Sequence, residues 1–339
     1  MPLPAIPLAL VLLMAAAIGF ATQRGNVCSV LAARQIVELR QASRARAFIL
    51  ASLWSLWIVA LLAWTTDLVA PARTYPLDIL TLVGAVAYGA GTMLNGACVF
   101  GTAARILSGN LSFVATLFGV VIGGALGSVL QIRDLRVPAV ASPLAMPTVA
   151  GAVAVTVAAS CCAVALAHFW WRERGKATTI MAMFGGARWP TAVAMPVIGV
   201  LGGLLLASNL PWNYPVVLRG LGVVAAGVPV KFAAVSLYGP LAFVCGGVLA
   251  ARIGGRAAWQ RPVPAQVARC VGGGTLMGVA GYLLPGGNDV LLLYGLPSLS
   301  LHALVAYVVM LAVQISLAFA QQAWRTSRAI ALCGPGMTR

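Results

Sequence analysis

The stretch "LNGACVFGTAARILSGN", residues 94–110, separates two long apolar runs and differs from both of them in composition. It places Cys98 between Gly96 and Gly101, with Asn95 ahead of the thiol and Arg105 behind it. Glycine lets a helix end in a tight turn and lets other groups approach the backbone closely. The stretch therefore predicts a break between two helices, with a thiol at the start of the second.

The chain around this break has the composition of an integral membrane protein. Of its 339 residues, 61% are hydrophobic and 8% are charged, and the mean hydropathy is +0.97. A soluble domain carries about 25% charged residues. The net charge of +16 comes from basic residues in short connections between apolar runs, which indicates the positive-inside signal rather than a nucleic-acid-binding surface.

We predict an all-α polytopic membrane protein with about nine transmembrane helices and about four short re-entrant half-helices, arranged as an inverted repeat. Each predicted span is close to the roughly 20 residues that cross the hydrocarbon of a bilayer. The spans are 3–22, 47–66, 79–96, 110–131, 146–170, 190–208, 233–251, 266–284 and 298–320.

The basic residues predict the orientation in the inner (plasma) membrane. Segments 34–46, 172–188 and 252–269 and the tail are rich in arginine, so we place them in the cytoplasm. Segments 67–78, 132–145 and 209–218 then lie outside. The N-terminus is predicted outside and the C-terminus in the cytoplasm.

Four apolar connections begin and end on the same side in this topology. They are "GNVCSVLAARQIV" (25–37), "ACVFGTAARIL" (97–107), "PVVLRGLGVVAAGVPV" (215–230) and "NDVLLLYGLP" (288–297). Two pairs that dip from opposite faces are typical of an inverted-repeat transporter. The predicted division is a first repeat 1–131, a linker 132–189 containing span 146–170, a second repeat 190–320 and a cytoplasmic tail 321–339.

Three of these breaks carry the candidate path residues. The side chains predicted to line a substrate path are Cys28, Cys98, Asn288, Asn26, Asn95 and Asp289, and the glycines of the breaks are Gly25, Gly96, Gly101, Gly286 and Gly287. A helix that starts at such a break points its N–H groups and its dipole into the membrane, which favours an anion. The alternative is that small residues serve only tight packing between membrane helices.

Asp289 has two interpretations. An intramembrane carboxylate is a functional candidate and a possible proton site, but the same side chain can cap the helix that follows it. The cysteines show no CxxC spacing, and His168 and His302 are isolated in the chain. We therefore predict no metal site, no cofactor and no catalytic residue.

The chain resembles the YeeE/YedE family of sulfur-transport membrane proteins, whose characterised members take up thiosulfate. The resemblance rests on "GFATQRGNVCSVLAAR" (19–34), "YGAGTMLNGACVFGTAARILSGNLSF" (88–113) and "GGGTLMGVAGYLLPGGNDVLLLYGLPSLSLHALVAY" (272–307). It implies an inverted-repeat helical bundle in which thiosulfate passes between cysteine thiols along a narrow path. Cys28 and Cys98 fall on the first two of these thiol positions.

The third thiol position departs from the family pattern. A typical member has a Gly-Gly-Cys-Asn motif, whereas this chain has Gly286, Gly287, Asn288 and Asp289. The departure leaves open thiosulfate, another sulfur species or another small anion as the substrate. The resemblance also implies a possible TusA-like sulfur carrier, which here would be a separate polypeptide.

Three functions remain as hypotheses. The favoured one is a transporter or channel, not an enzyme, for a small sulfur-containing anion. The second is a membrane sulfur-transfer enzyme that forms a persulfide on Cys28 or Cys98 and passes sulfur to a cytoplasmic acceptor. The third is an interaction protein whose glycines only pack helices.

Overall fold

The computed structural model describes residues 7–71, 73–132, 138–173, 188–210, 212–255, 257–284 and 286–333, and its elements there are all helices. A helix lies in each of the nine predicted apolar spans. They are α1 (Leu8–Gly25), α3 (Ser43–Thr65), α4 (Ile79–Asn95), α6 (Val114–Val129), α7 (Val149–Glu173), α9 (Thr191–Ala207), α11 (Ala234–Ile253), α12 (Pro264–Leu283) and α14 (Leu301–Cys333). The all-α prediction is confirmed.

Each of the four apolar connections also forms a short helical element. These are α2 (Ser29–Leu39), α5 (Val99–Leu107), α10 (Tyr214–Ala225) and α13 (Asn288–Val290), the last continuing through η3 (Leu291–Gly295) and η4 (Leu296–Ser298). A further turn, η1 (Leu111–Phe113), precedes α6. The breaks before α2, α5 and α13 contain the candidate path residues.

The helices are those of a multi-pass membrane protein. Within the described ranges, seven helical stretches are long and apolar enough to cross a membrane, or eight if α12 and the segment Asn288–Ser298, bent by 50°, form one span. Two of these stretches, Leu8–Leu39 and Ile79–Leu107, run through the breaks before α2 and α5. Helix α9 is a shorter apolar helix. The count of nine spans stays a prediction.

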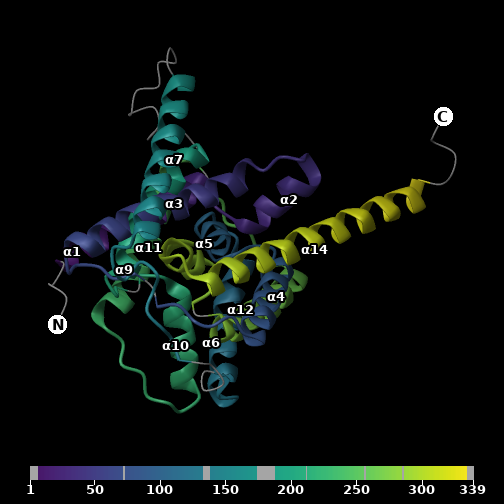
Figure 1. Ribbon diagram of the computed structural model, residues 1–339. Coiled ribbons are helices and arrows are strands. Elements are labelled where there is room, and N and C mark those ends of the chain that lie inside the picture. The colour runs from purple at the N-terminus through teal and green to yellow at the C-terminus, as the bar shows by residue number, and fades with distance from the viewer. Residues whose placement is uncertain are drawn as a thin grey trace.

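The main helices pack in pairs, and each pair combines a helix from residues 1–131 with a helix from the part of the chain after residue 190 (Figure 1). Helix α1 lies against α11, α3 against α9, α4 against α14 and α6 against α12, while α2 contacts α14 and α10 contacts α6. Glycines lie where these helices cross closely. Small residues are expected there, because lipid provides no hydrophobic force between helices and close van der Waals packing must hold them together. Helix α7 packs chiefly against α3, and the C-terminal half of α14 projects away from the other helices.

Connections that are far apart in the sequence contact each other at two places. The backbone of Thr74 pairs with Val140, and the Ser300 hydroxyl donates to Thr74 Oγ1 at 2.6 Å. Asn110 pairs with Gln260. Most of the predicted cytoplasmic segment 172–188, and the tail beyond residue 333, lie outside the described residues. Which end faces the cytoplasm stays a prediction.

Candidate functional site

Cys28 and Cys98 meet in the interior of the bundle. Cys28 is the N-cap residue of α2 and Cys98 that of α5, and both have extended backbone that turns their chains into these helices. The Ser29 N–H donates to Cys98 Sγ at 3.3 Å, so the Cys98 thiol lies at the start of α2, next to Cys28. The exposed fractions of the side chains are 1% and 0%. The structure thus brings together two residues that are far apart in sequence.

Gly101 makes room for this thiol pair. A methyl group at its Cα would lie 2.5 Å from Cys28 Sγ and 2.9 Å from Cys28 Cβ. Gly96 has a different task, since its φ of 82° ends α4 in the left-handed region and its missing Cβ faces nothing within 4 Å. One glycine is required for space and the other for backbone conformation.

Asn26 and Gly25 hold the break before α2. Asn26 ends α1 with a φ of 47°, and its carbonyl accepts a hydrogen bond of 2.9 Å from Arg44 Nη1. A Cβ on Gly25 would lie 2.5 Å from the Cβ of Ala194 on α9. Both residues therefore shape the turn that presents Cys28.

Asn95 links the two sides of the break between α4 and α5 by hydrogen bonds. Its Nδ2 donates to the Ala97 carbonyl at 2.7 Å and to Thr102 Oγ1 at 2.8 Å, and its Oδ1 accepts from Thr116 Oγ1 at 2.7 Å. Cys270 lies beside the same residue, with its Sγ 4.0 Å from the Asn95 carbonyl oxygen. Both polar atoms of the Asn95 amide therefore form hydrogen bonds with other groups of the protein.

A second group of polar side chains, the amide cluster, forms where α10 and α13 begin. It consists of Asn213, Asn288 and Asp289. Asn213 Nδ2 donates to Asp289 Oδ2 at 2.6 Å, and Asn213 and Asp289 are 2% and 1% exposed. Asn288 is 0% exposed, and neither atom of its amide has a hydrogen-bond partner among the described residues. Asp289 is thus not simply a helix cap, because its carboxylate holds a side chain from another element.

Gly286 and Gly287 bring the backbone of the amide cluster close to α4. Gly286 and Gly287 have φ values of 118° and 105°, which a residue with a side chain rarely adopts. A Cβ on Gly287 would lie 3.1 Å from the Tyr88 hydroxyl. Tyr88, a residue missed in the sequence, therefore reaches the Asn288 cluster from α4.

Tyr214 connects the amide cluster to the thiol pair. Its hydroxyl donates to the Val99 carbonyl, next to Cys98, at 2.7 Å, and it follows Asn213 directly in the chain. A cavity of about 10 Å³ lies here, lined in part by Tyr88, Val99 and Tyr214. That volume holds about one water molecule. The space between the two clusters is therefore too small for a larger anion.

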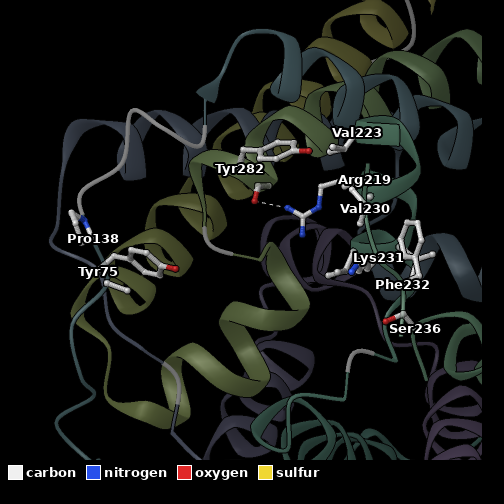
Figure 2. Close-up of a pocket in the computed structure, with 14 residues that line it drawn as sticks. Tyr75, Pro138, Arg219, Val223, Val230, Lys231, Phe232, Ser236 and Tyr282 are labelled. Carbon is white, nitrogen blue, oxygen red and sulfur yellow. Dashed lines mark hydrogen bonds between the residues drawn. The ribbon is translucent and has the colours of Figure 1, made fainter. Parts of the chain in front are cut away.

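Two larger cavities open on the side of the amide cluster. One, of about 620 Å³, is lined by Arg219 and Lys231 among apolar side chains. Figure 2 shows Arg219 between Tyr282 and Lys231, with its guanidinium directed at the Gly281 carbonyl, to which it donates. The other, of about 580 Å³, includes Arg73 and Gly286 in its lining. Cations thus face both cavities.

Polar side chains also lie beside the thiol pair. Gln314 Nε2 donates to Ser29 Oγ at 3.1 Å and to Thr92 Oγ1 at 2.9 Å. Gln314 is 0% exposed and lies in the middle of α14, an apolar helix. A buried glutamine in a predicted span was the available signal for this residue, which the sequence analysis missed.

Asn213 and Tyr214 were also missed as residues of this site, although "NYPVVLRG" begins one of the predicted half-helices. Their signal was a cluster of polar side chains at that break. Within the described ranges, no group of three His, Cys, Asp or Glu side chains could hold a metal ion.

Comparison with known proteins identifies the chain's relatives at the level of a family. A family model described as sulphur transport matches residues 24–315, which is most of the chain. The match includes the thiol pair and the amide cluster. A search of curated proteins finds no match.

Proposed function

This chain belongs to the sulphur-transport family, and we propose that it carries thiosulfate or a related small sulfur-containing anion across the inner membrane along a narrow path through Cys28 and Cys98. The observation that carries the proposal is the hydrogen bond from the Ser29 N–H to Cys98 Sγ, which places the Cys98 thiol next to Cys28 at the N-terminus of α2. Helix N-termini favour anions, and a thiol offers a weak donor and a polarisable surface. Such a site can hold a sulfur anion without retaining it.

The proposed path begins in the cavity lined by Arg219 and Lys231. It continues past Tyr88 and Tyr214 to the thiol pair and then to Ser29 and Gln314. The cations draw the anion from water, and the narrow part between the tyrosines must widen during transport. Asn288 replaces the third thiol of the family pattern at the outer end of the narrow part.

An inverted repeat with re-entrant half-helices is the topology we propose for this path. Its support is a symmetry in the helix contacts when residues 1–131 are exchanged with 190–320. The pair α1–α11 then maps onto α9–α3, the pair α4–α14 onto α12–α6, and the pair α2–α14 onto α10–α6. A bundle without a repeat has no reason to show these matched pairs.

Uptake by purified protein in liposomes tests the proposal. We expect saturable entry of radiolabelled thiosulfate, reduced about tenfold or more in Cys28→Ala and Cys98→Ala, which corresponds to roughly 1.4 kcal/mol or more at the barrier. Cys245→Ala is the matched control, because this cysteine is exposed on the surface of the bundle. Equal uptake by all three variants and the wild type would contradict the thiol path.

The same preparation separates transport from sulfur transfer. A persulfide on Cys28 or Cys98 would add the mass of a sulfur atom to the intact protein after exposure to thiosulfate. We expect no such adduct. If transport depends on a separate TusA-like carrier, the liposomes will show uptake only when that carrier is enclosed.

A further inference from the structure

The amide cluster contains an acid that the thiol path does not require. Asp289 accepts a hydrogen bond from Asn213 through Oδ2, while its Oδ1 has no hydrogen-bond partner in the described part of the chain. A buried carboxylate oxygen without a partner is costly when the group is ionised. Its presence between the outer cavities and the thiol pair calls for a function.

Most of the unpartnered atoms in the cluster are acceptors. Across the described residues, four buried atoms of the cluster lack partners: Asp289 Oδ1, Asn213 Oδ1, Asn288 Oδ1 and Asn288 Nδ2. Three of them are acceptors when the carboxylate is ionised, and only Asn288 Nδ2 is a donor. A proton on Asp289 Oδ1 converts this acceptor into a donor.

The charged and titratable neighbours of Asp289 come from α4 and α10. Arg219 is its cationic neighbour, and Tyr88 and Tyr214 lie within electrostatic range of it. Arg219 donates to the carbonyls of Gly281 and Gly286, at 3.0 Å for the second, so the guanidinium is engaged with the backbone. The positive charge of Arg219 favours an ionised Asp289 carboxylate while no anion is bound, and its Oδ1 accepts no hydrogen bond from the described residues.

We infer that Asp289 carries a proton that crosses the membrane together with the anion. The inference rests on the proposed transport function and adds its coupling ion. A proton from the outer water forms an O–H bond at the carboxylate when the anion arrives, because two negative charges side by side favour protonation of one. The O–H bond breaks as the anion leaves, and the proton passes to the inner water.

Coupling of this kind offsets the charge that the anion moves. A membrane potential that is negative inside opposes the entry of an anion, and each accompanying proton cancels one negative charge. The fixed cations at the outer cavities attract the anion but do not travel with it. A mobile proton on Asp289 supplies the compensation that Arg219 and Lys231 cannot.

Simultaneous measurement of protons and anion tests the inference. Liposomes holding a pH-sensitive dye receive radiolabelled thiosulfate, and we expect the interior to acidify in constant proportion to thiosulfate entry. Asp289→Asn should abolish the acidification and reduce uptake, and Asp289→Glu should restore both. Asp67→Asn, the same change at an exposed acid, should behave as the wild type.

Three results would overturn the coupling while leaving transport intact: thiosulfate entry without acidification, an unchanged proton-to-anion ratio in Asp289→Asn, or uptake driven by a sodium gradient alone. Failure of the wild type to move any thiosulfate would instead contradict the proposed function. Infrared spectroscopy then tests the proton without transport. We expect a carboxylic C=O band to appear in the wild type, but not in Asp289→Asn, when thiosulfate is added, and its absence from the wild type with thiosulfate bound would refute protonation of Asp289.

Discussion

The break between α4 and α5 and the break between α12 and α13 each contain a buried asparagine beside glycine, but the two amides are treated in opposite ways. Asn95 uses its amide to bind Ala97, Thr102 and Thr116. Asn288 is equally buried, and its amide has no partner among the residues that the structure describes. Buried polar groups are nearly always hydrogen-bonded, so an exception requires an explanation.

The difference indicates that the two breaks have different roles, one in stability and the other in binding a ligand. A fully bonded amide contributes to the stability of the fold, whereas an amide without partners costs stability and remains available to a ligand. The first break therefore holds Cys98 in place by an internal network. The second break leaves its polar atoms available near the two larger cavities.

Removing the two amides should give the largest contrast. Asn95→Ala leaves Thr102, Thr116 and the Ala97 carbonyl without their bonds, and we expect a loss of about 2–5 kcal/mol in stability. Asn288→Ala removes no bond, so its stability should stay within about 1 kcal/mol of the wild type, while thiosulfate uptake falls. Thermal unfolding of the detergent-solubilised variants, with uptake measured beside it, checks both.

Two results would refute these different roles of Asn95 and Asn288. Equal destabilisation by the two alanine variants would mean that Asn288 has a structural role after all. Full uptake by a stable Asn288→Ala protein would mean that its amide serves no ligand.

A smaller effect is expected from the two glycines of the first break. Gly101→Ala places a methyl group 2.5 Å from Cys28 Sγ, and such overpacking costs about 1–3 kcal/mol. The thiol must move away from Cys98, so uptake should fall as far as it does in Cys28→Ala. Titration of the two buried thiols with a small alkylating reagent should show faster modification of Cys28.

Gly96→Ala is the matched control for this change. It meets nothing within 4 Å and affects only a residue at positive φ, which costs about 1–2 kcal/mol. We expect it to lower stability with little effect on thiol reactivity. If both variants alter the Cys28 thiol equally, the contact between Gly101 and Cys28 is not what positions the pair.

The sequence predicted the helical architecture and the location of the breaks because both follow from local properties. Nine apolar segments of span length and four shorter apolar connections indicate where helices start and stop, and helices occur at all of these places. The pairing of Cys28 with Cys98 was expected only from the proposed topology. The path roles of these residues stay predictions.

The partners of each polar side chain could not be predicted, because they come from distant parts of the chain. Asn95 binds Thr116 across 21 positions, Asn213 binds Asp289 across 76, and Gln314 binds Ser29 across 285. Asn95 and Asn288 look alike in the sequence, since each lies beside glycine in an apolar region. Only the fold distinguishes a bonded amide from an unbonded one.

The smallest expected effect concerns the cations outside the second break. Lys231 is exposed and lines the same cavity as Arg219, so its charge attracts the anion from a distance without holding it. Lys231→Ala should raise the KM for thiosulfate about two- to threefold at low ionic strength, and salt should remove the difference because it screens exposed charges. Lys231→Arg keeps the charge and should match the wild type. An effect that persists at high salt would show direct contact between Lys231 and the anion, and the site for the anion would then extend from the amide cluster into the outer cavity.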